Sequence, residues 1–466
     1  MQSIILRVAT FAVSNKDIGL INLTQMKKTF YTILLCLFVS ASAMAQMSLN
    51  DCMIYARDHA ADNRRQELSY RAAQENRRSA YYNYLPSVGA SVSGQINYGR
   101  SIDPETNVYA TRSTAHNGYS LSLSLPLFTG LANFNNVRMS RAIERQNRSL
   151  VQANQDKVSH AVMQAYYSCV YYRKTLEQMQ EQLEASQLSL KQGQVKLSMG
   201  AVSQADVAQL EANVAGDEYA VVEQQNRYDL SLLELKATMN WPLDSLLEVD
   251  ATLSEPDPTE IILPDEEVLL LQALASLPEV KAAQEALKGS RYALKSTISG
   301  FLPSLSFSAG YSTSYYVDLK DKAGYAPFHR QLDINGGEYL GLSLSVPIFN
   351  RLSNVQSYRK SKLSYKMQQL EYEQTLYTVE SEIRQAVLDL HGAHKEYISA
   401  HRRLKAVELA HKANVRRYEQ GVLSPLELKS SSSQLAEAKA IAIGKSIQFL
   451  IKERQIEYYE GRPFIR

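Results

Sequence analysis

The feature that most constrains the fold is an internal duplication. The alternating segment Tyr119–Gly130 (YSLSLSLPLFTG) recurs as Gly341–Asn350 (GLSLSVPIFN), and Leu121 aligns with Leu342 at an offset of 221 residues. Later in the chain, GAVSQAD from Gly200 falls on GVLSPLE from Gly421 at the same offset. A repeat of this length describes one structural unit that occurs twice. We therefore expect one pseudo-symmetric chain and not a series of unrelated domains.

The N-terminus carries a targeting signal. Lys27 and Lys28 precede an apolar run that ends in the small-residue pattern Ala43-Met44-Ala45, as in a secretory signal peptide, and this apolar run is too short to span a bilayer. Residues 1–25 are predicted to be an upstream extension. The predicted organisation is an extension and signal peptide over 1–45, a first repeat over 46–242, a linker over 243–264 and a second repeat over 265–466.

Composition narrows the classes of function. Removal of residues 1–45 leaves 46 of the 50 basic and 47 of the 48 acidic residues, so the net charge is near zero and does not indicate nucleic-acid binding. Only Cys52 and Cys169 remain, far apart and not at ligand spacing, which argues against a disulfide framework or a zinc site. We expect no cofactor.

An enzyme is one alternative to consider. His391 and His394 are three residues apart and could present two imidazoles on one helix face, but no carboxylate and cysteine set surrounds them. The sequence has no glycine-rich phosphate loop, nucleophile elbow or paired acid-base motif near a strand end. Polar side chains that face water along a helix explain the histidines as well as a metal site does.

Two windows without proline predict long helices. No proline lies between residues 127 and 241 or between 348 and 424. Apolar and small residues recur there at spacings of four and three, from Val158 to Leu197 and from Val379 to Tyr418, which is typical of coiled-coil packing. A helix over 132–199 would be roughly 100 Å long at about 1.5 Å per residue.

Each long helix is predicted to reverse at a short turn, so each repeat contains an antiparallel helical hairpin. A shorter helix is expected before each pair of strands, over 49–82 and 266–297. The residues that suit the caps of the hairpins are Gly200 and Gly421 at the helix ends and Ser203, Ser424 and Pro425 at the starts of the returning helices.

Four alternating segments, each of about 9 to 11 residues, predict strands with one apolar and one polar face, and strands of this length cross a bilayer when tilted. No charged residue falls on the apolar face of these segments, so we expect that face to meet lipid and the polar face to line a lumen. The residues expected to face lipid are Leu121, Leu123, Leu125, Phe307, Tyr311, Leu342, Leu344 and Val346. Those expected to face the lumen are Ser122, Ser124, Ser306, Ser308, Ser343 and Ser345.

Four strands cannot close a barrel by themselves. Unpaired backbone groups at the sheet edges cost several kcal/mol each in hydrocarbon, so the barrel is expected to be shared between chains. Two copies would give eight strands and a filled interior, whereas three would give twelve strands and an open lumen. The alternative is a small soluble sheet buried under the helices.

The sequence combines the secretory signal, the tandem repeat, the LPS and LPLF or VPIF motifs at the strands, the long heptad helices and the Gly-x-x-Ser-x-x-acidic turns. Taken together, these features resemble the TolC-type outer-membrane efflux family, also called outer membrane factors. The resemblance covers residues 48–463. It implies an α+β membrane protein: a homotrimer whose 12-stranded transmembrane β-barrel, with four strands per chain, continues into a long α-helical barrel in the periplasm.

The resemblance also implies a function without chemistry on the substrate. A member of this family is the exit channel of a tripartite efflux or type I secretion system in the outer membrane of a Gram-negative bacterium. Its partners are a periplasmic adaptor (membrane fusion) protein, an inner-membrane pump of the RND, ABC or MFS type, and outer-membrane lipid. A periplasmic coiled-coil structural or adhesive protein without a channel is the alternative, but it explains only the heptads.

In that family the hairpin tips form the periplasmic entrance and meet the adaptor. The residues that the resemblance assigns to adaptor docking are Gly200, Val202, Ser203, Gly421, Leu423 and Ser424. For the periplasmic gate, Tyr418 matches the family's tyrosine and Glu427 its first aspartate, and Asp206 is the equivalent acidic residue of the first turn. Leu423 stands where the family has a gate arginine and Ser430 where it has a second aspartate, so closure is expected to use other contacts.

Overall fold

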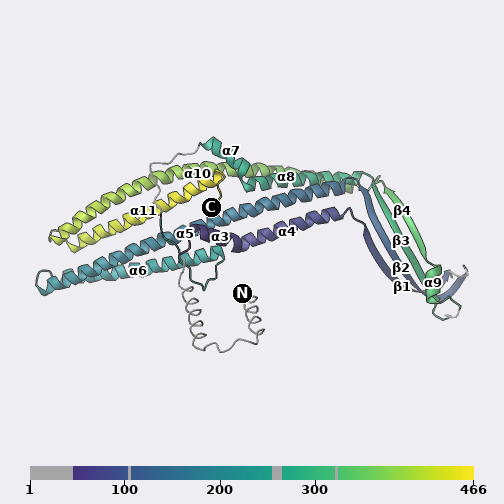
Figure 1. Ribbon diagram of the computed structural model, residues 1–466, viewed down its shortest axis with the longest axis horizontal. Coiled ribbons are helices and arrows are strands. Elements are labelled where there is room, and N and C mark those ends of the chain that lie inside the picture. The colour runs from purple at the N-terminus through teal and green to yellow at the C-terminus, as the bar shows by residue number, and fades with distance from the viewer. Residues whose placement is uncertain (1–45, 103–106, 254–264, 321–323, 466) are drawn as a thin grey trace, which may run out of the picture.

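The computed structural model describes residues 46–102, 107–253, 265–320 and 324–465. The predicted extension and signal peptide over 1–45, and the part of the predicted linker over 254–264, lie outside these residues. The described chain is elongated, with a four-stranded sheet at one end and the tips of two helical hairpins at the other (Figure 1).

Two 67-residue helices, α5 (Ala132–Ser198) and α10 (Ser353–Glu419), form the long arms of the two hairpins. The returning arms are α6 (Gln204–Met239) and α11 (Pro425–Tyr459). The heptad prediction is confirmed, because none of the predicted seam positions from Val158 to Leu197 or from Val379 to Tyr418 is exposed.

The seam residues build two separate cores. The first surrounds Val162, Cys169 and Met239 and joins α5 and α6 to the N-terminal helix α3 (Leu49–His59). The second surrounds Ile383 and Phe449 and joins α10 and α11 to α7 (Glu266–Ser276). In both cores a short helix covers the middle of a long hairpin, and the first core also takes in Ile447 of α11 and Phe464 from the second repeat.

The prediction of one short helix before each strand pair is wrong, because each consists of two helices. In the first repeat Ala60 is extended (ψ 131°) between α3 and α4 (Ala61–Tyr82). The Asn63 amide donates to the carbonyls of Ala56 and Arg57 beside the break. In the second repeat Leu277 is extended (ψ 129°) between α7 and α8 (Pro278–Thr297). Pro278 disfavours the helical conformation of the residue before it, which explains the second break.

The strands form one antiparallel sheet in the order β1-β2-β3-β4. Their bounds are β1 (Ser87–Ile102), β2 (Tyr109–Thr129), β3 (Ser304–Asp318) and β4 (Gly337–Ser345). The register pairs Leu123 with both Val88 and Ala309, and Ser124 with both Ser87 and Ser308. Because directly opposed residues share a face, the predicted apolar set lies on one face of the sheet and the predicted serines lie on the other.

The predicted strand lengths need correction. β1, β2 and β3 contain 16, 21 and 15 residues, and only β4, with nine, has the predicted length. The extension of β1 brings Arg100 onto the apolar face near the end of the sheet farthest from the helices. Glu338 of β4 also lies on that face, opposite Tyr311 in the middle of β3, and Val346 lies just beyond β4. Backbone pairing does not depend on side-chain polarity, so the ladder continues where the alternating pattern stops.

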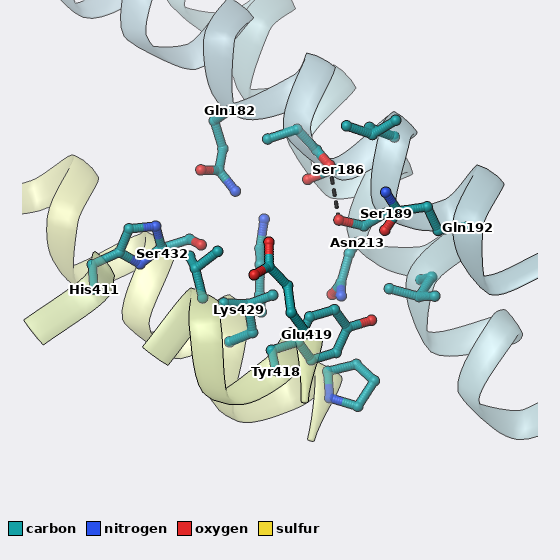
Figure 2. A pocket seen from close by; sticks show the side chains of 16 residues that line it. Gln182, Ser186, Ser189, Gln192, Asn213, His411, Tyr418, Glu419, Lys429 and Ser432 are labelled. Carbon is teal, nitrogen blue, oxygen red and sulfur yellow. Dashed lines mark hydrogen bonds between the residues drawn. The ribbon is translucent and has the colours of Figure 1, made fainter. Parts of the chain in front are cut away.

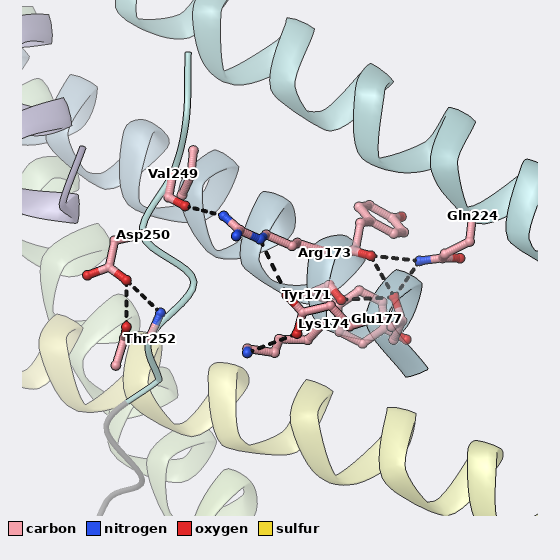
Figure 3. Close-up of polar contacts among 10 residues, drawn as sticks. Tyr171, Arg173, Lys174, Glu177, Gln224, Val249, Asp250 and Thr252 are labelled. Carbon is pink, nitrogen blue, oxygen red and sulfur yellow. Dashed lines mark hydrogen bonds and ion pairs between the residues drawn. The ribbon is translucent and has the colours of Figure 1, made fainter. Parts of the chain in front are cut away.

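The segment after α6, which includes Val249 and Asp250, crosses the middle of α5 and is held there by hydrogen bonds (Figure 3). Arg173 Nη1 donates to the Val249 carbonyl at 2.7 Å. The Tyr166 hydroxyl donates to the Asp250 carbonyl at 2.6 Å. Met47 pairs with Val249 in a parallel bridge. The residues just before α3 and the start of the predicted linker are thereby joined beside the middle of α5.

A left-handed turn connects β2 to α5. Gly130 (φ 60°) and Leu131 (φ 69°) are both in the left-handed region, and their repeat equivalents Arg351 and Leu352 adopt it too. Gly130 is buried, and a Cβ added there would lie 2.8 Å from the Ser299 carbonyl oxygen. The close packing against Ser299 therefore requires glycine in the first repeat, whereas Arg351 adopts the same backbone conformation in the second.

We expect Gly130→Ala to destabilise the protein by about 1 to 3 kcal/mol, because the new methyl group adds a backbone clash to a positive φ. The measurement is thermal unfolding of the purified protein, followed by circular dichroism at the helix band. Gly392→Ala is the matched control: Gly392 lies within α10 with no heavy atom near its missing Cβ, so alanine should leave stability unchanged or raise it. Equal unfolding temperatures for Gly130→Ala and the unmodified protein would contradict this account.

Candidate functional site

The tips of the two hairpins are closed by the same cap geometry. Gly200 (φ 72°) and Gly421 (φ 74°) follow the last residues of the long helices in the left-handed conformation. Ala201 N donates to the Lys196 carbonyl at 2.9 Å, and Val422 N donates to the Arg417 carbonyl at the same distance. The predicted glycine caps are confirmed, and they satisfy helix carbonyls that would otherwise lack a donor.

The serines of both turns begin the returning helices, as predicted, and each forms a capping box. Asp206 N donates to Ser203 Oγ at 3.2 Å while Ser203 N donates to Asp206 Oδ2 at 3.0 Å. Ser424 and Glu427 make the same reciprocal pair in the second hairpin. Pro425 occupies the first turn of α11, also as predicted.

The capping boxes fix the charge of the two predicted gate carboxylates. Hydrogen bonds from the Ser203 side chain and backbone lower the pKa of Asp206, and bonds from the Ser424 backbone and side chain lower the pKa of Glu427. Both groups are therefore ionised at neutral pH, and both stabilise the start of their own helix. A structural role alone accounts for their position in the turn.

Tyr418, the third predicted gate residue, faces the other hairpin. The Lys196 ammonium of α5 lies 5.8 Å from the centre of the Tyr418 ring. Burial and the nearby charge of Asp206 raise the pKa of Tyr418. The fold thus brings Tyr418 and Asp206 near each other across the two hairpins, whereas Glu427 stays at its own cap near Arg417.

A cavity of about 230 Å³ lies between the hairpins behind the tips (Figure 2). All four long arms contribute to its wall, and most of the labelled side chains in Figure 2 are polar. The labelled residues are Gln182, Ser186, Ser189 and Gln192 of α5, Asn213 of α6, His411, Tyr418 and Glu419 of α10, and Lys429 and Ser432 of α11.

A partly buried charge pair joins the hairpins beside this cavity. The Lys429 ammonium of α11 contacts the Asp217 carboxylate of α6, and Ser186 of α5 donates its hydroxyl to the same carboxylate. The side chain of Asp217 is 11% exposed and that of Lys429 25%. One acidic group therefore connects both arms of the first hairpin to the second.

Sequence reasoning did not identify Asp217 or Lys429. A signal was present in α6, where buried polar residues follow Leu210 at intervals of seven: Asp217, Gln224 and Ser231. A polar residue repeated at a core position of a heptad needs a partner on a neighbouring helix. The pattern could have indicated a polar contact, but not which residue of α11 supplies it.

The histidines and cysteines considered in the sequence analysis do not form a metal site or a disulfide among the described residues. The ring of His394 lies 5.8 Å from that of Phe449, and within the described part of the chain no three His, Cys, Asp or Glu residues are grouped so that they could hold a metal ion. Cys52 and Cys169 are buried in the first core and are not bridged to each other, and burial raises the pKa of the Cys52 thiol to about 12. A hydropathy search of the described helices finds none that is long and apolar enough to span a membrane.

Comparisons with known proteins agree on one type of molecule. A family model described as outer membrane efflux protein matches residues 56–240 and 269–461. The crystal structure of the CmeC outer membrane channel of Campylobacter jejuni is similar at a TM-score of 0.76 and 18% identity, covering 89% of this chain and 85% of that one.

Two further solved structures are similar over comparable lengths. The outer membrane protein VceC of Vibrio cholerae matches with a TM-score of 0.71 and 16% identity over 89% of this chain and 96% of its own. The open state of the MtrE outer membrane channel of Neisseria gonorrhoeae matches with a TM-score of 0.66 and 18% identity over 88% of each chain. No curated protein sequence matches the chain.

The contact between Lys429 and Asp217 is testable by a double-mutant cycle. Lys429→Ala leaves a mostly buried carboxylate without its cation and should destabilise the protein by about 1 to 3 kcal/mol, less than a fully buried pair because Lys429 is partly exposed. Asp217→Ala should cost a similar amount, and the double variant less than the sum of the two single losses.

The measurement for this cycle is again thermal unfolding. Lys412→Ala is a suitable control, since Lys412 is exposed on α10 and its change should have little effect. Strictly additive losses in the double variant would show that the two side chains do not stabilise each other.

Proposed function

Because this chain belongs to the outer membrane efflux protein family, we propose that it is the exit channel of a tripartite efflux system or a type I secretion system. Three copies form the channel, with the strands in the outer membrane and the helices in the periplasm. An adaptor protein and an inner-membrane pump of the RND, ABC or MFS type deliver the substrate and supply the energy. The channel itself performs no chemistry.

The observation that carries this proposal is the sheet. Leu342 and Leu344 are 69% and 66% exposed on its apolar face, and β1 and β4 have no second strand partner among the described residues. In water such a face would be covered by a core, whereas lipid is a suitable solvent for it. In lipid the two open edges must pair with other copies, and twelve strands give the smallest such barrel with an open lumen.

The hairpin tips are proposed to dock the adaptor. Gly200, Ser203, Gly421 and Ser424 are exposed, and Val202 and Leu423 are half-buried beside them. Cap geometry holds these six residues in rigid turns, so they can form a preorganised surface at the entrance. Tyr418, Asp206 and Glu427 are proposed to line the entrance next to that surface.

The alternative, a periplasmic coiled-coil structural or adhesive protein, has less support. It would account for the heptad seams of α5 and α10. It would leave the apolar face of the sheet exposed to water, and it does not need a polar face on the opposite side.

A pair of neighbouring substitutions tests the assigned faces. Leu344→Arg should prevent assembly in the outer membrane, because a charge in contact with lipid costs about 2 to 4 kcal/mol per copy near the bilayer centre. Ser343→Arg, one residue away on the polar face, should be tolerated. The measurement is the amount of crosslinked oligomer in the outer-membrane fraction. Equal amounts for the two variants would refute the lipid-facing assignment.

A substitution at the second tip tests docking. Gly421→Pro is incompatible with a φ of 74° and removes the bond from Gly421 N to the Tyr418 carbonyl, so the tip should lose its shape while the rest of the channel assembles. We expect normal amounts of oligomer but impaired efflux, measured as accumulation of a fluorescent pump substrate in cells. Gly216→Ala, at an uncrowded position of α6, is the control and should transport normally. Normal efflux by Gly421→Pro would argue against docking at this tip.

A further inference from the structure

The end of β3 farthest from the helices is wrapped by residues 324–335. β4 pairs with β3 only as far as Ser312 and Gly337, so the next β3 residues have no strand partner on that side in the described chain. Residues 324–335, which contain α9 (Phe328–Ile334), supply hydrogen bonds to the β3 backbone instead. The Gln331 amide accepts from Tyr316 N and donates to the Tyr316 carbonyl, both at 2.9 Å, and Gln331 is only 5% exposed.

Further side-chain bonds hold this segment against β3. Thr313 Oγ1 donates to the Leu332 carbonyl at 2.7 Å, and Asn335 Nδ2 donates to the Ser314 carbonyl at 2.8 Å. The Phe328 ring packs against Tyr315 on the apolar face at 5.2 Å. The segment is therefore bound at the edge of β3 and on the apolar face.

The same segment also reaches the polar face, through Tyr325. The Tyr325 ring lies 5.6 Å from that of Tyr316, and Arg112 Nη1 donates to the Tyr325 hydroxyl at 3.0 Å. Arg112 Nε also lies 3.5 Å from Asp318 Oδ2. In the register, Arg112, Tyr316 and Asp318 lie on the same face as Ser122.

Side chains on the polar face are more buried at the far end of the sheet, where Tyr325 lies, than nearer the helices. Ser122 and Ser312, nearer the helices, are exposed. At the far end Thr114, Tyr316 and Asp318 are 0%, 9% and 3% exposed. Figure 1 shows α9 at this far end of the sheet. The polar face is thus open over most of its length and covered at its end.

We propose that Tyr325, the part of this segment that lies over the polar face, forms a constriction at the outer mouth of the channel, which restricts the size of the molecules that pass. This inference rests on the proposed function, in which the polar face lines the lumen. Each of three copies contributes one Tyr325 above the lumen wall, held by Arg112 of the neighbouring strand β2. The selectivity of such a pore depends on its narrowest diameter and on the groups that line it.

Thiol labelling from outside the cell tests the constriction. Ser122→Cys introduces a reactive group on the open part of the polar face, whereas Cys52 and Cys169 are each 0% exposed and should not react. Two membrane-impermeant reagents are added to intact cells: a small charged thiosulfonate and a maleimide on a polyethylene glycol of several kilodaltons.

With Ser122→Cys alone, the small reagent should react readily and the polymer slowly. Addition of Tyr325→Ala should raise the polymer's rate by about tenfold and that of the small reagent by less than about twofold, because only the polymer is limited by pore diameter. Tyr98→Ala is the matched control: Tyr98 is 78% exposed on the apolar face, and its loss should change neither rate.

The outcomes separate this inference from the proposed function. An unchanged polymer rate in Tyr325→Ala overturns the constriction. Failure of the small reagent to reach the thiol introduced by Ser122→Cys in correctly assembled protein contradicts the polar face as a lumen wall, and so contradicts the proposed function. If Tyr325→Ala does not assemble, Arg112→Gln gives the same test, since it removes the bond to the Tyr325 hydroxyl and should raise the polymer's rate.

Discussion

Backbone N–H and C=O groups in a β-strand need partners wherever water is absent, and the four strands of this chain satisfy that need only in part. β2 and β3 are paired on both sides, whereas β1 and β4 each have one open edge in the described structure. β4 pairs with β3 only as far as Ser312. Beyond that point the side chain of Gln331 makes the hydrogen bonds to the backbone of Tyr316 that a strand would otherwise make. The proposed trimer follows from the same requirement, because additional copies of the sheet can pair the remaining edges.

The long helices must pack against their neighbours over a length of roughly 100 Å. Their seams contain many small residues, such as Ala386, Ala393 and Ala400, which allow close approach but bury little apolar area. Polar contacts across the seam supplement this packing, and the pair Lys429–Asp217 connects one hairpin to the other. The cavity behind the tips lies beside that pair.

Features that depend on residues close together in the sequence were predictable. The glycine caps, the serine N-caps and Pro425 were read from residue type and position, because each acts within one helical turn. The two faces of the sheet followed from the alternation of leucine and serine. The break at Leu277 was not predicted although Pro278 is a local signal for it. The break at Ala60 and the full strand lengths were not predicted, because a favourable pattern continues across that break and stops before the strands end.

The sequence by itself determined the repeat, the helical and strand periods, the turns and the family, since all of these are recorded in local spacing and residue type. Only the tertiary structure decided which distant groups meet. Lys429 contacts Asp217 from 212 residues away, and Arg112 contacts Tyr325 from 213 residues away. A contact of this kind leaves no periodic signature, because its partners are selected by the packing of whole helices and strands and not by the residues beside them.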